Sequence, residues 1–210
     1  MYIKVCDYIS MTSHSPSSTV CHIYIHRSYF FKNKEKKTNQ SFKLLYKMPM
    51  KLEGSCQCGQ VQFTLDSQTP VPYQLCACSI CRKVGGYSGS VNLGGIADSL
   101  KVIKGKDVIK KYSAIKDRGT NKEELCSSER NFCSNCSTML WLWDHNWPEL
   151  IHPFASAIDT ELPAPDAMVC VMAGSKPSWV RWPEGEKSVH ELYGEDSLEG
   201  WHKKHNLFFQ

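Results

Sequence analysis

The feature that most constrains this chain is the grouping of its cysteines. The sequence has 11 cysteines in 210 residues, and seven of them lie in three close groups. In chain order the groups are Cys56 and Cys58; Cys76, Cys78 and Cys81; and Cys133 and Cys136. Scaffolds held by disulfides are also rich in cysteine, but they are short and secreted. The grouping in a chain of this length therefore favours metal binding over a disulfide framework.

The spacing within the groups is typical of zinc ligands. Thiolates in C-x-C and C-x-x-C spacing can face one metal ion, and zinc takes four such ligands in a tetrahedron. Seven sulfurs divide as four and three, which predicts one closed structural site and one site with three protein ligands. The spacing alone does not decide which groups share a metal. If the group of three belongs to a second closed site instead, the candidates for its fourth ligand are Cys126, His145, His152 and Cys170.

Residues 1–47 differ in character from the rest of the chain. They contain eight of the 25 Lys and Arg but only two of the 21 Asp and Glu, and they show no sustained hydrophobic period. These features predict a disordered basic leader at 1–47 and a folded domain at 48–210. Met48 or Met50 could be the true start of the protein, because the composition changes abruptly there.

No segment of the sequence is typical of a membrane or secreted protein. The longest apolar runs are far shorter than the roughly 20 residues that a membrane helix needs. The first 31 residues lack the charged start, apolar block and cleavage site of a signal peptide. We therefore expect an intracellular, cytoplasmic protein that has no membrane partner and does not bind nucleic acid.

Alternation of apolar and polar residues predicts a mainly β fold with few short helices. In residues 61–65 the apolar Val61, Phe63 and Leu65 alternate with polar neighbours, as in a strand with one buried face. A helix is expected only at 197–208, with a short turn after Cys81. Further strands are expected within 89–94, 99–105, 108–115, 138–144 and 167–174.

Three stretches, "GSCQCGQVQF", "CACSICRKVGG" and "RNFCSNCSTMLW", resemble the signatures of the glutathione-dependent formaldehyde-activating enzyme (GFA) family. That family includes the centromere protein V-like proteins, and "ELIHPFASAIDTELPAP" and "SWVRW" are similar to fungal members. The resemblance implies a small, zinc-pinned β-tent domain with two Zn²⁺ per chain. It implies a structural zinc bound by Cys56, Cys58, Cys133 and Cys136, and a catalytic zinc bound by Cys76, Cys78 and Cys81.

The resemblance also implies an activity. Family members are carbon–sulfur lyases that act on a thiol–aldehyde adduct of the S-hydroxymethylglutathione type, so a thiol such as glutathione and an aldehyde are the expected partners. A zinc ion bound by three thiolates can activate an incoming thiol, because the thiolate is the nucleophile. Two alternatives stay open. One is a non-enzymatic zinc-binding module for a macromolecular partner, and the other is a zinc store or redox sensor.

One residue departs from the family pattern. Ser137 follows the last cysteine, where the family usually has glycine. Glycine there would allow a positive φ, which costs a residue with a side chain on the order of 1 kcal/mol. We expect the zinc ligands to be unaffected, because zinc binding supplies far more free energy than this.

Polar residues near the cysteines have both a functional and a structural interpretation. Asp144, His145 and His152 are candidates for proton transfer near the metal, although a single histidine is more often structural. Arg82 and Lys83 follow the group of three and could bind substrate carboxylates, but exposure to solvent is the simpler expectation. Trp141 and Trp143 are expected in the core because they alternate with Leu140 and Leu142.

Overall fold

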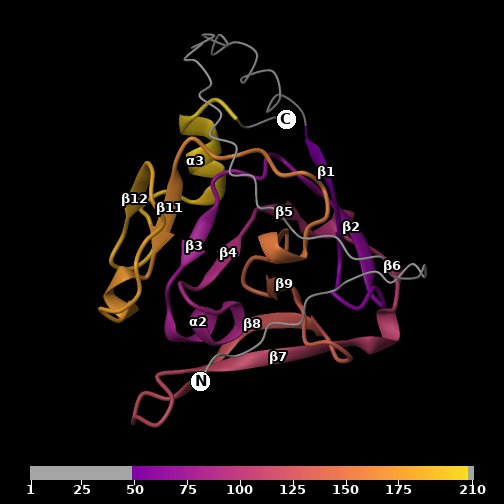
Figure 1. Ribbon diagram of the computed structural model, residues 1–210, viewed down its shortest axis with the longest axis horizontal. Helices are drawn as coiled ribbons and strands as arrows, with labels where there is room; N and C mark the ends of the chain where they lie inside the picture. Colours follow the sequence, from indigo (N-terminus) through magenta and orange to yellow (C-terminus); the bar gives the residue numbers. More distant parts are fainter. Residues whose placement is uncertain (1–48, 208–210) are drawn as a thin grey trace, which may run out of the picture. The chain divides into compact units, whose positions relative to one another are not determined.

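Residues 49–207 are mainly β in this computed structural model of the chain, as the sequence predicted (Figure 1). The predicted leader at 1–47 lies outside the described residues. The strands form three sheets, with the spatial orders β1-β2-β6, β5-β10-β9-β8-β7 and β12-β11-β3-β4. In the described part of the chain, no helix is long and apolar enough to cross a membrane.

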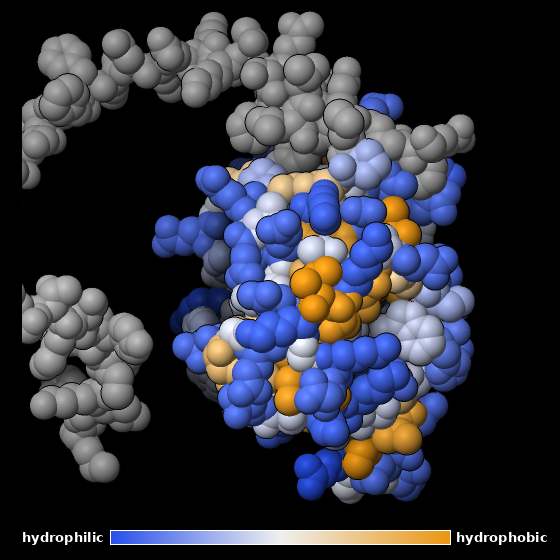
Figure 2. All heavy atoms as spheres, turned by 90° about the vertical axis from the view of Figure 1, so that its right-hand side faces the viewer, coloured by the Kyte–Doolittle hydropathy of each residue, from blue (hydrophilic) through white to orange (hydrophobic). Residues whose placement is uncertain are grey.

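The three-stranded sheet is built on an antiparallel hairpin of β1 and β2. On β2, Phe63 and Leu65 are each 1% exposed, and Val61 just before it is fully buried. The alternation predicted for residues 61–65 is therefore confirmed. Figure 2 faces this side of the molecule and shows several small apolar areas among hydrophilic side chains. The strands are β1 (Met50–Ser55), β2 (Gln62–Ser67) and β6 (Lys101–Lys104).

The five-stranded sheet is antiparallel throughout. Trp141 of β9 packs edge-to-face on Phe63, with 5.0 Å between ring centroids, so one face of this sheet shares a core with the three-stranded sheet. Trp141 is buried, as expected, whereas Trp143 is half-buried at the edge of that core. The strands are β5 (Gly95–Ile96), β10 (Leu150–Pro153), β9 (Met139–Asp144), β8 (Glu124–Cys133) and β7 (Ile109–Lys116).

The four-stranded sheet has mixed direction. Strand β11 is parallel to both β12 and β3, and β4 is antiparallel to β3. Cys170 and Val171 of β11 are buried, which agrees with the buried strand predicted in 167–174. The strands are β12 (Lys187–Val189), β11 (Met168–Val171), β3 (Gln74–Cys76) and β4 (Ser90–Asn92).

The described residues contain two short α-helices, α2 (Ser79–Gly85) and α3 (Leu198–Lys204). Helix α3 lies within the predicted segment 197–208. The turn expected after Cys81 is instead the α2 helix, which begins before that cysteine because Cys78 caps its N-terminus. Short 3₁₀ helices are η1 (Ala97–Ser99), η2 (Lys106–Val108), η3 (Ala155–Ala157) and η4 (Ala173–Ser175).

Candidate metal centres

Four sulfurs meet between the β1–β2 turn and the β8–β9 turn. The Sγ atoms of Cys56, Cys58, Cys133 and Cys136 all lie within 4.8 Å of one another. The Sγ atom of Cys58 lies 3.4 Å from that of Cys56 and 3.8 Å from that of Cys133. Tetrahedral zinc with Zn–S bonds of about 2.3 Å places its sulfurs about 3.8 Å apart. This four-sulfur group could therefore hold a metal ion such as zinc.

The two turns shape the four-sulfur group through backbone hydrogen bonds. In the first turn the Val61 N–H donates to Cys56 Sγ at 3.2 Å. In the second, the Ser137 N–H donates to the carbonyl of Cys133 at 2.8 Å, and Ser137 has a φ of 62°. The positive φ expected at this position is confirmed, so Ser137 has the left-handed conformation that favours glycine.

Hydrogen bonds and burial act on the thiols of the four-sulfur group in opposite directions. Burial is the largest influence on Cys133 and raises the pKa of its thiol to about 11. Burial also acts to raise the pKa of Cys136, but hydrogen bonds from Thr138 and Cys58 outweigh it and lower that pKa to about 6. The group thus contains a thiol that ionises readily and one whose ionisation needs a nearby cation.

Three more sulfurs meet where β3 leads into α2. The Sγ atoms of Cys76, Cys78 and Cys81, here called the triad, also lie within 4.8 Å of one another. Cys76 ends β3, Cys78 caps α2, and Cys81 lies in the first turn of that helix. The Cys81 N–H donates to Cys78 Sγ at 3.3 Å. Cys76 and Cys81 are buried, whereas Cys78 is half-buried.

Neighbouring elements hold the triad in place. Ser90 of β4 donates its hydroxyl to the carbonyl of Cys81 at 3.0 Å. Gly89 has a φ of 121°, and a Cβ on it would lie 2.0 Å from the Cys76 carbonyl oxygen, so only glycine fits there. Arg82 donates to the carbonyls of Ala77 and Ser175. Its guanidinium is therefore bound to backbone and Arg82 is half-buried, whereas Lys83 is exposed as expected.

Hydrogen bonds among the triad thiols shift their pKa values in opposite directions. The pKa of Cys78 is lowered because Cys76 and Cys81 donate hydrogen bonds to its thiolate. The pKa of Cys76 is raised because it donates to Cys78 and Cys81 and because it is buried. One thiolate is thus favoured and the other two thiols hold their protons. Binding of a metal by three thiolates must release the remaining protons.

None of the four candidates for an additional ligand belongs to the triad. The group of mutually close ligand atoms contains only its three sulfurs, and does not include Cys126, Cys170, His145 or His152. Cys170 is buried and Cys126 half-buried, as ordinary thiols are. His145 is exposed. Both metal-site groups therefore contain the residues that the resemblance assigns to them, and zinc binding by these residues stays a prediction.

Asp144 and His152 have partners of their own. The carboxylate of Asp144 accepts from the Ser127 hydroxyl at 2.7 Å and from the Asn146 N–H at 2.9 Å. Burial acts to raise the pKa of Asp144, but these bonds and the charge of His145 hold it below its usual value. The Nδ1 atom of His152 lies 3.3 Å from the Leu93 carbonyl, and burial lowers the pKa of this imidazole. Both side chains are thus held by structural contacts.

Two residues near the triad were not predicted. Arg130 of β8 is 4% exposed, and its positive charge acts on the Cys81 thiol. Tyr193 is 72% exposed, and its pKa is raised by partial loss of solvent around its hydroxyl and by the charges of the triad sulfurs, so this loop residue also lies near them. The sequence holds a weak signal for Arg130, which directly precedes the "NFCSNC" stretch, and none for Tyr193.

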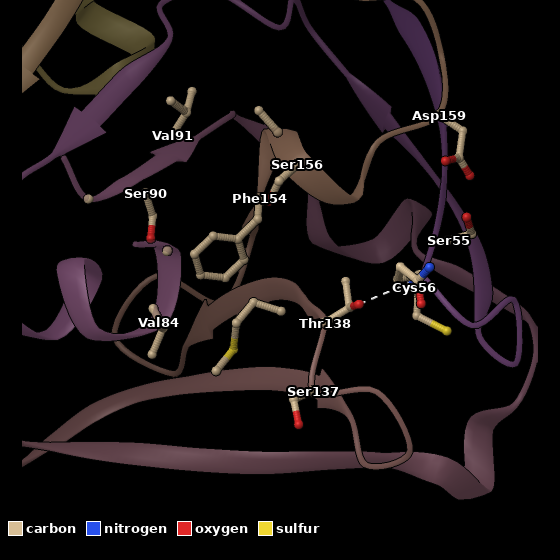
Figure 3. Close-up of a pocket in the computed structure, with 15 residues that line it drawn as sticks. Ser55, Cys56, Val84, Ser90, Val91, Ser137, Thr138, Phe154, Ser156 and Asp159 are labelled. Atoms are coloured by element: carbon tan, nitrogen blue, oxygen red, sulfur yellow. Dashed lines mark hydrogen bonds between the residues drawn. The ribbon is translucent and has the colours of Figure 1, made fainter. Parts of the chain in front are cut away.

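A cavity of about 700 Å³ lies between the end of α2 and the four-sulfur group, whose Cys56 is one of its lining residues (Figure 3). Its wall includes Val84 at the end of α2, Phe154, and Thr138 next to the four-sulfur group. Asp159 is the one charged side chain among its lining residues. The triad sulfurs are not among those residues, and the lining residue Gly89 contacts the backbone carbonyl of Cys76 rather than a sulfur.

Known proteins resemble this chain in sequence. The family model described as glutathione-dependent formaldehyde-activating enzyme matches residues 51–173. A protein of Halomonas elongata, provisionally named a glutathione-dependent formaldehyde-activating enzyme, is 44% identical over 160 residues, which cover 75% of this chain and 98% of that protein. A crystal structure of a Rhodobacter sphaeroides protein matches with a TM-score of 0.42 and 21% identity over 54% of this chain and 92% of that one. That structural similarity is too low to carry an argument, but the sequence matches show that the chain belongs to the GFA family.

Proposed function

We propose that this protein is a zinc-dependent carbon–sulfur lyase that makes and breaks the adduct of a thiol, such as glutathione, with an aldehyde, such as formaldehyde. Membership of the GFA family and the name of the Halomonas elongata relative support the substrates. The observation that carries the reaction is the triad, a set of three close sulfurs that stands apart from the four-sulfur group.

The two groups have different roles in this proposal. Cys56, Cys58, Cys133 and Cys136 hold a structural zinc, because four thiolates complete its tetrahedron. Cys76, Cys78 and Cys81 hold a second zinc, which leaves a ligand position for the substrate thiol. Zinc bound there would supply a lowered thiol pKa and a fixed position for the thiolate.

The residues around the triad keep its three ligands in place. The Cys81 N–H holds the Cys78 sulfur, and Ser90 and Arg82 fix the backbone of the β3–α2 connection. A rigid set of ligands favours a reaction that depends on bringing thiol and aldehyde together. In the addition, the thiol loses its proton, a carbon–sulfur bond forms, and the aldehyde oxygen gains a proton. The reverse reaction restores both substrates.

The first test is the zinc content of the purified chain and of Cys78→Ser. We expect two zinc ions per chain in the wild type and one in the variant, because Ser is a poor zinc ligand. Cys126→Ser is the matched control, since Cys126 belongs to neither group, and it should keep both ions. One zinc in both the wild type and Cys78→Ser would contradict a triad site and would favour a non-enzymatic zinc module.

The second test is the reaction itself. Glutathione and formaldehyde combine without an enzyme, so the rate must be measured as exchange at equilibrium by NMR. We expect saturable acceleration by the wild type and loss of that acceleration in Cys78→Ser. If the wild type binds two zinc ions but accelerates exchange for neither glutathione nor other thiols, the lyase proposal is wrong.

A further inference from the structure

Arg130 is a buried cation, and two of its three guanidinium nitrogens have no hydrogen-bond partner. Its side chain is 4% exposed, and its Nε and Nη1 atoms are buried and unpaired. Arginine keeps its charge at any physiological pH, and a buried charge without a partner costs several kcal/mol. Buried charges in proteins are normally paired with an opposite charge. We therefore expect a bound ion or ligand to supply the opposite charge for Arg130.

No carboxylate in the described residues forms an ion pair with Arg130. The nearest acidic residue in sequence, Glu129, forms an ion pair with Lys111 at 2.6 Å between Nζ and Oε2. Asp144 accepts hydrogen bonds from Ser127 and Asn146. The other ion pairs within residues 49–207 are Lys203–Glu199 and Lys204–Asp196.

The strand register directs Arg130 away from the main core. Its neighbour Asn131 is opposite Trp141, whose ring packs on Phe63 between the two sheets. Successive side chains of a strand point to opposite faces, so Arg130 points to the other face of the five-stranded sheet. Residues that are directly opposite one another on neighbouring strands share a face. Arg130 is paired with Leu142, and Leu142 is paired with His152, so these three side chains lie on the same face.

The triad lies on that other side. The charge of Arg130 acts on Cys81 and on Tyr193, and Tyr193 in turn is affected by all three triad sulfurs. The guanidinium of Arg130 therefore lies within electrostatic range of Cys81, on the face of the five-stranded sheet that points away from Phe63.

We propose that Arg130 is the countercharge of the triad when zinc is bound, and so a positioning residue that strengthens metal binding there. Three thiolates and one Zn²⁺ ion sum to a charge of −1, and the guanidinium makes the buried assembly neutral. The inference rests on the proposed function only in that the triad binds zinc, and it does not depend on which substrate the enzyme uses.

The test compares Arg130→Met and Arg130→Lys with the wild type in the full chain. Zinc affinity of the triad is measured by competition with a chromophoric chelator, with the four-sulfur group loaded. We expect Arg130→Met to weaken this affinity by about 10- to 100-fold, the range for partners of metal ligands. Arg130→Lys keeps the charge and should retain affinity within a few-fold. Arg118→Met, an exposed change in the β7–β8 turn, controls for net charge and should have no effect.

A second measurement separates the countercharge from a general structural role. With the triad emptied by chelator, Arg130→Met should have a higher melting temperature than the wild type, because it removes an unpaired buried charge. With the triad loaded, the order should reverse. If the Met variant does not fold, Arg130→Gln serves the same comparison.

Three results would overturn the inference. Equal zinc affinity in Arg130→Met and the wild type would refute the role of Arg130 as countercharge. The proposed function would not be affected by that result. Unchanged zinc affinity together with a raised KM for glutathione would assign the guanidinium to a substrate carboxylate instead. A wild-type triad that takes no zinc would refute both proposals.

Discussion

At the scale of single residues, Ser137 has a left-handed backbone conformation that its side chain disfavours. Its φ is 62°, and a side chain in this conformation costs about 1–2 kcal/mol. Ser137→Gly removes that cost but adds flexibility to the unfolded chain, which offsets about 0.5–1 kcal/mol. We expect a net gain of about 0.5 kcal/mol and a melting temperature about 1–2 °C higher, measured by calorimetry with zinc bound.

Ser137→Ala is the matched control for this prediction. Alanine also lacks the hydroxyl but keeps the Cβ that disfavours a positive φ, so its melting temperature should not rise. An equal rise in both variants would show that the hydroxyl, rather than the backbone conformation, causes the strain.

The metal-site cysteines could be predicted from sequence, and Arg130 could not, for a physical reason. C-x-x-C and C-x-C spacing confines two sulfurs to one turn, so local sequence nearly determines that they are close. The environment of Arg130 depends on how β8 packs against distant parts of the chain, and only the tertiary structure determines that. The positive φ at Ser137 could be predicted because the GFA family usually has glycine at this position.

At the scale of elements, helix α3 is attached to the domain through His202. This side chain is 5% exposed, and its Nε2 lies 2.7 Å from the Val71 carbonyl. Burial lowers the pKa of His202 in the folded protein, against the effect of that hydrogen bond. Below about pH 6.5 the unfolded chain therefore takes up the proton more readily than the folded chain, so this contribution to stability is lost as pH falls.

We predict that the melting temperature of the wild type falls more between pH 7.5 and pH 5.5 than that of His202→Gln. Glutamine can donate its Nε2–H to Val71 but does not titrate, which makes it the matched variant. Zinc loss at low pH affects both proteins, so the difference between them isolates His202. Identical pH profiles would contradict this role for the histidine.

Strand prediction succeeded where one face of a strand is apolar and failed at β8. The segments at 61–65 and 138–144 alternate because one of their faces meets the shared core. Strand β8 contains Ser127, Ser128, Glu129 and Arg130 in succession, which lack a hydrophobic period. It is a strand because β7 and β9 pair with it on both sides, and such pairing is not visible in the local sequence.

At the scale of the whole molecule, the two metal-site groups connect different parts of the fold. The four-sulfur group joins the β1–β2 turn of the three-stranded sheet to the β8–β9 turn of the five-stranded sheet. The triad joins only the end of β3 to the start of α2, six residues of continuous chain. Loss of the first group should release one sheet from the other, and loss of the second should loosen one local connection.

We therefore predict that Cys136→Ser destabilises the protein much more than Cys78→Ser. A structural zinc contributes on the order of 10 kcal/mol to folding, so Cys136→Ser should lower the melting temperature by well over about 10 °C or prevent folding. Cys78→Ser should lower it by only a few degrees. The melting temperature and the zinc content of both variants, each with Cys126→Ser as control, check this prediction.

The outcome separates two views of how zinc stabilises the domain. A large loss for Cys136→Ser alone would mean that the contact between sheets depends on the four-sulfur group, because the core around Phe63 and Trp141 cannot hold the two sheets together by itself. Equal losses for the two variants would contradict the division into structural and catalytic sites. The triad would then be a second structural centre, and a reaction at its metal would lose its main support.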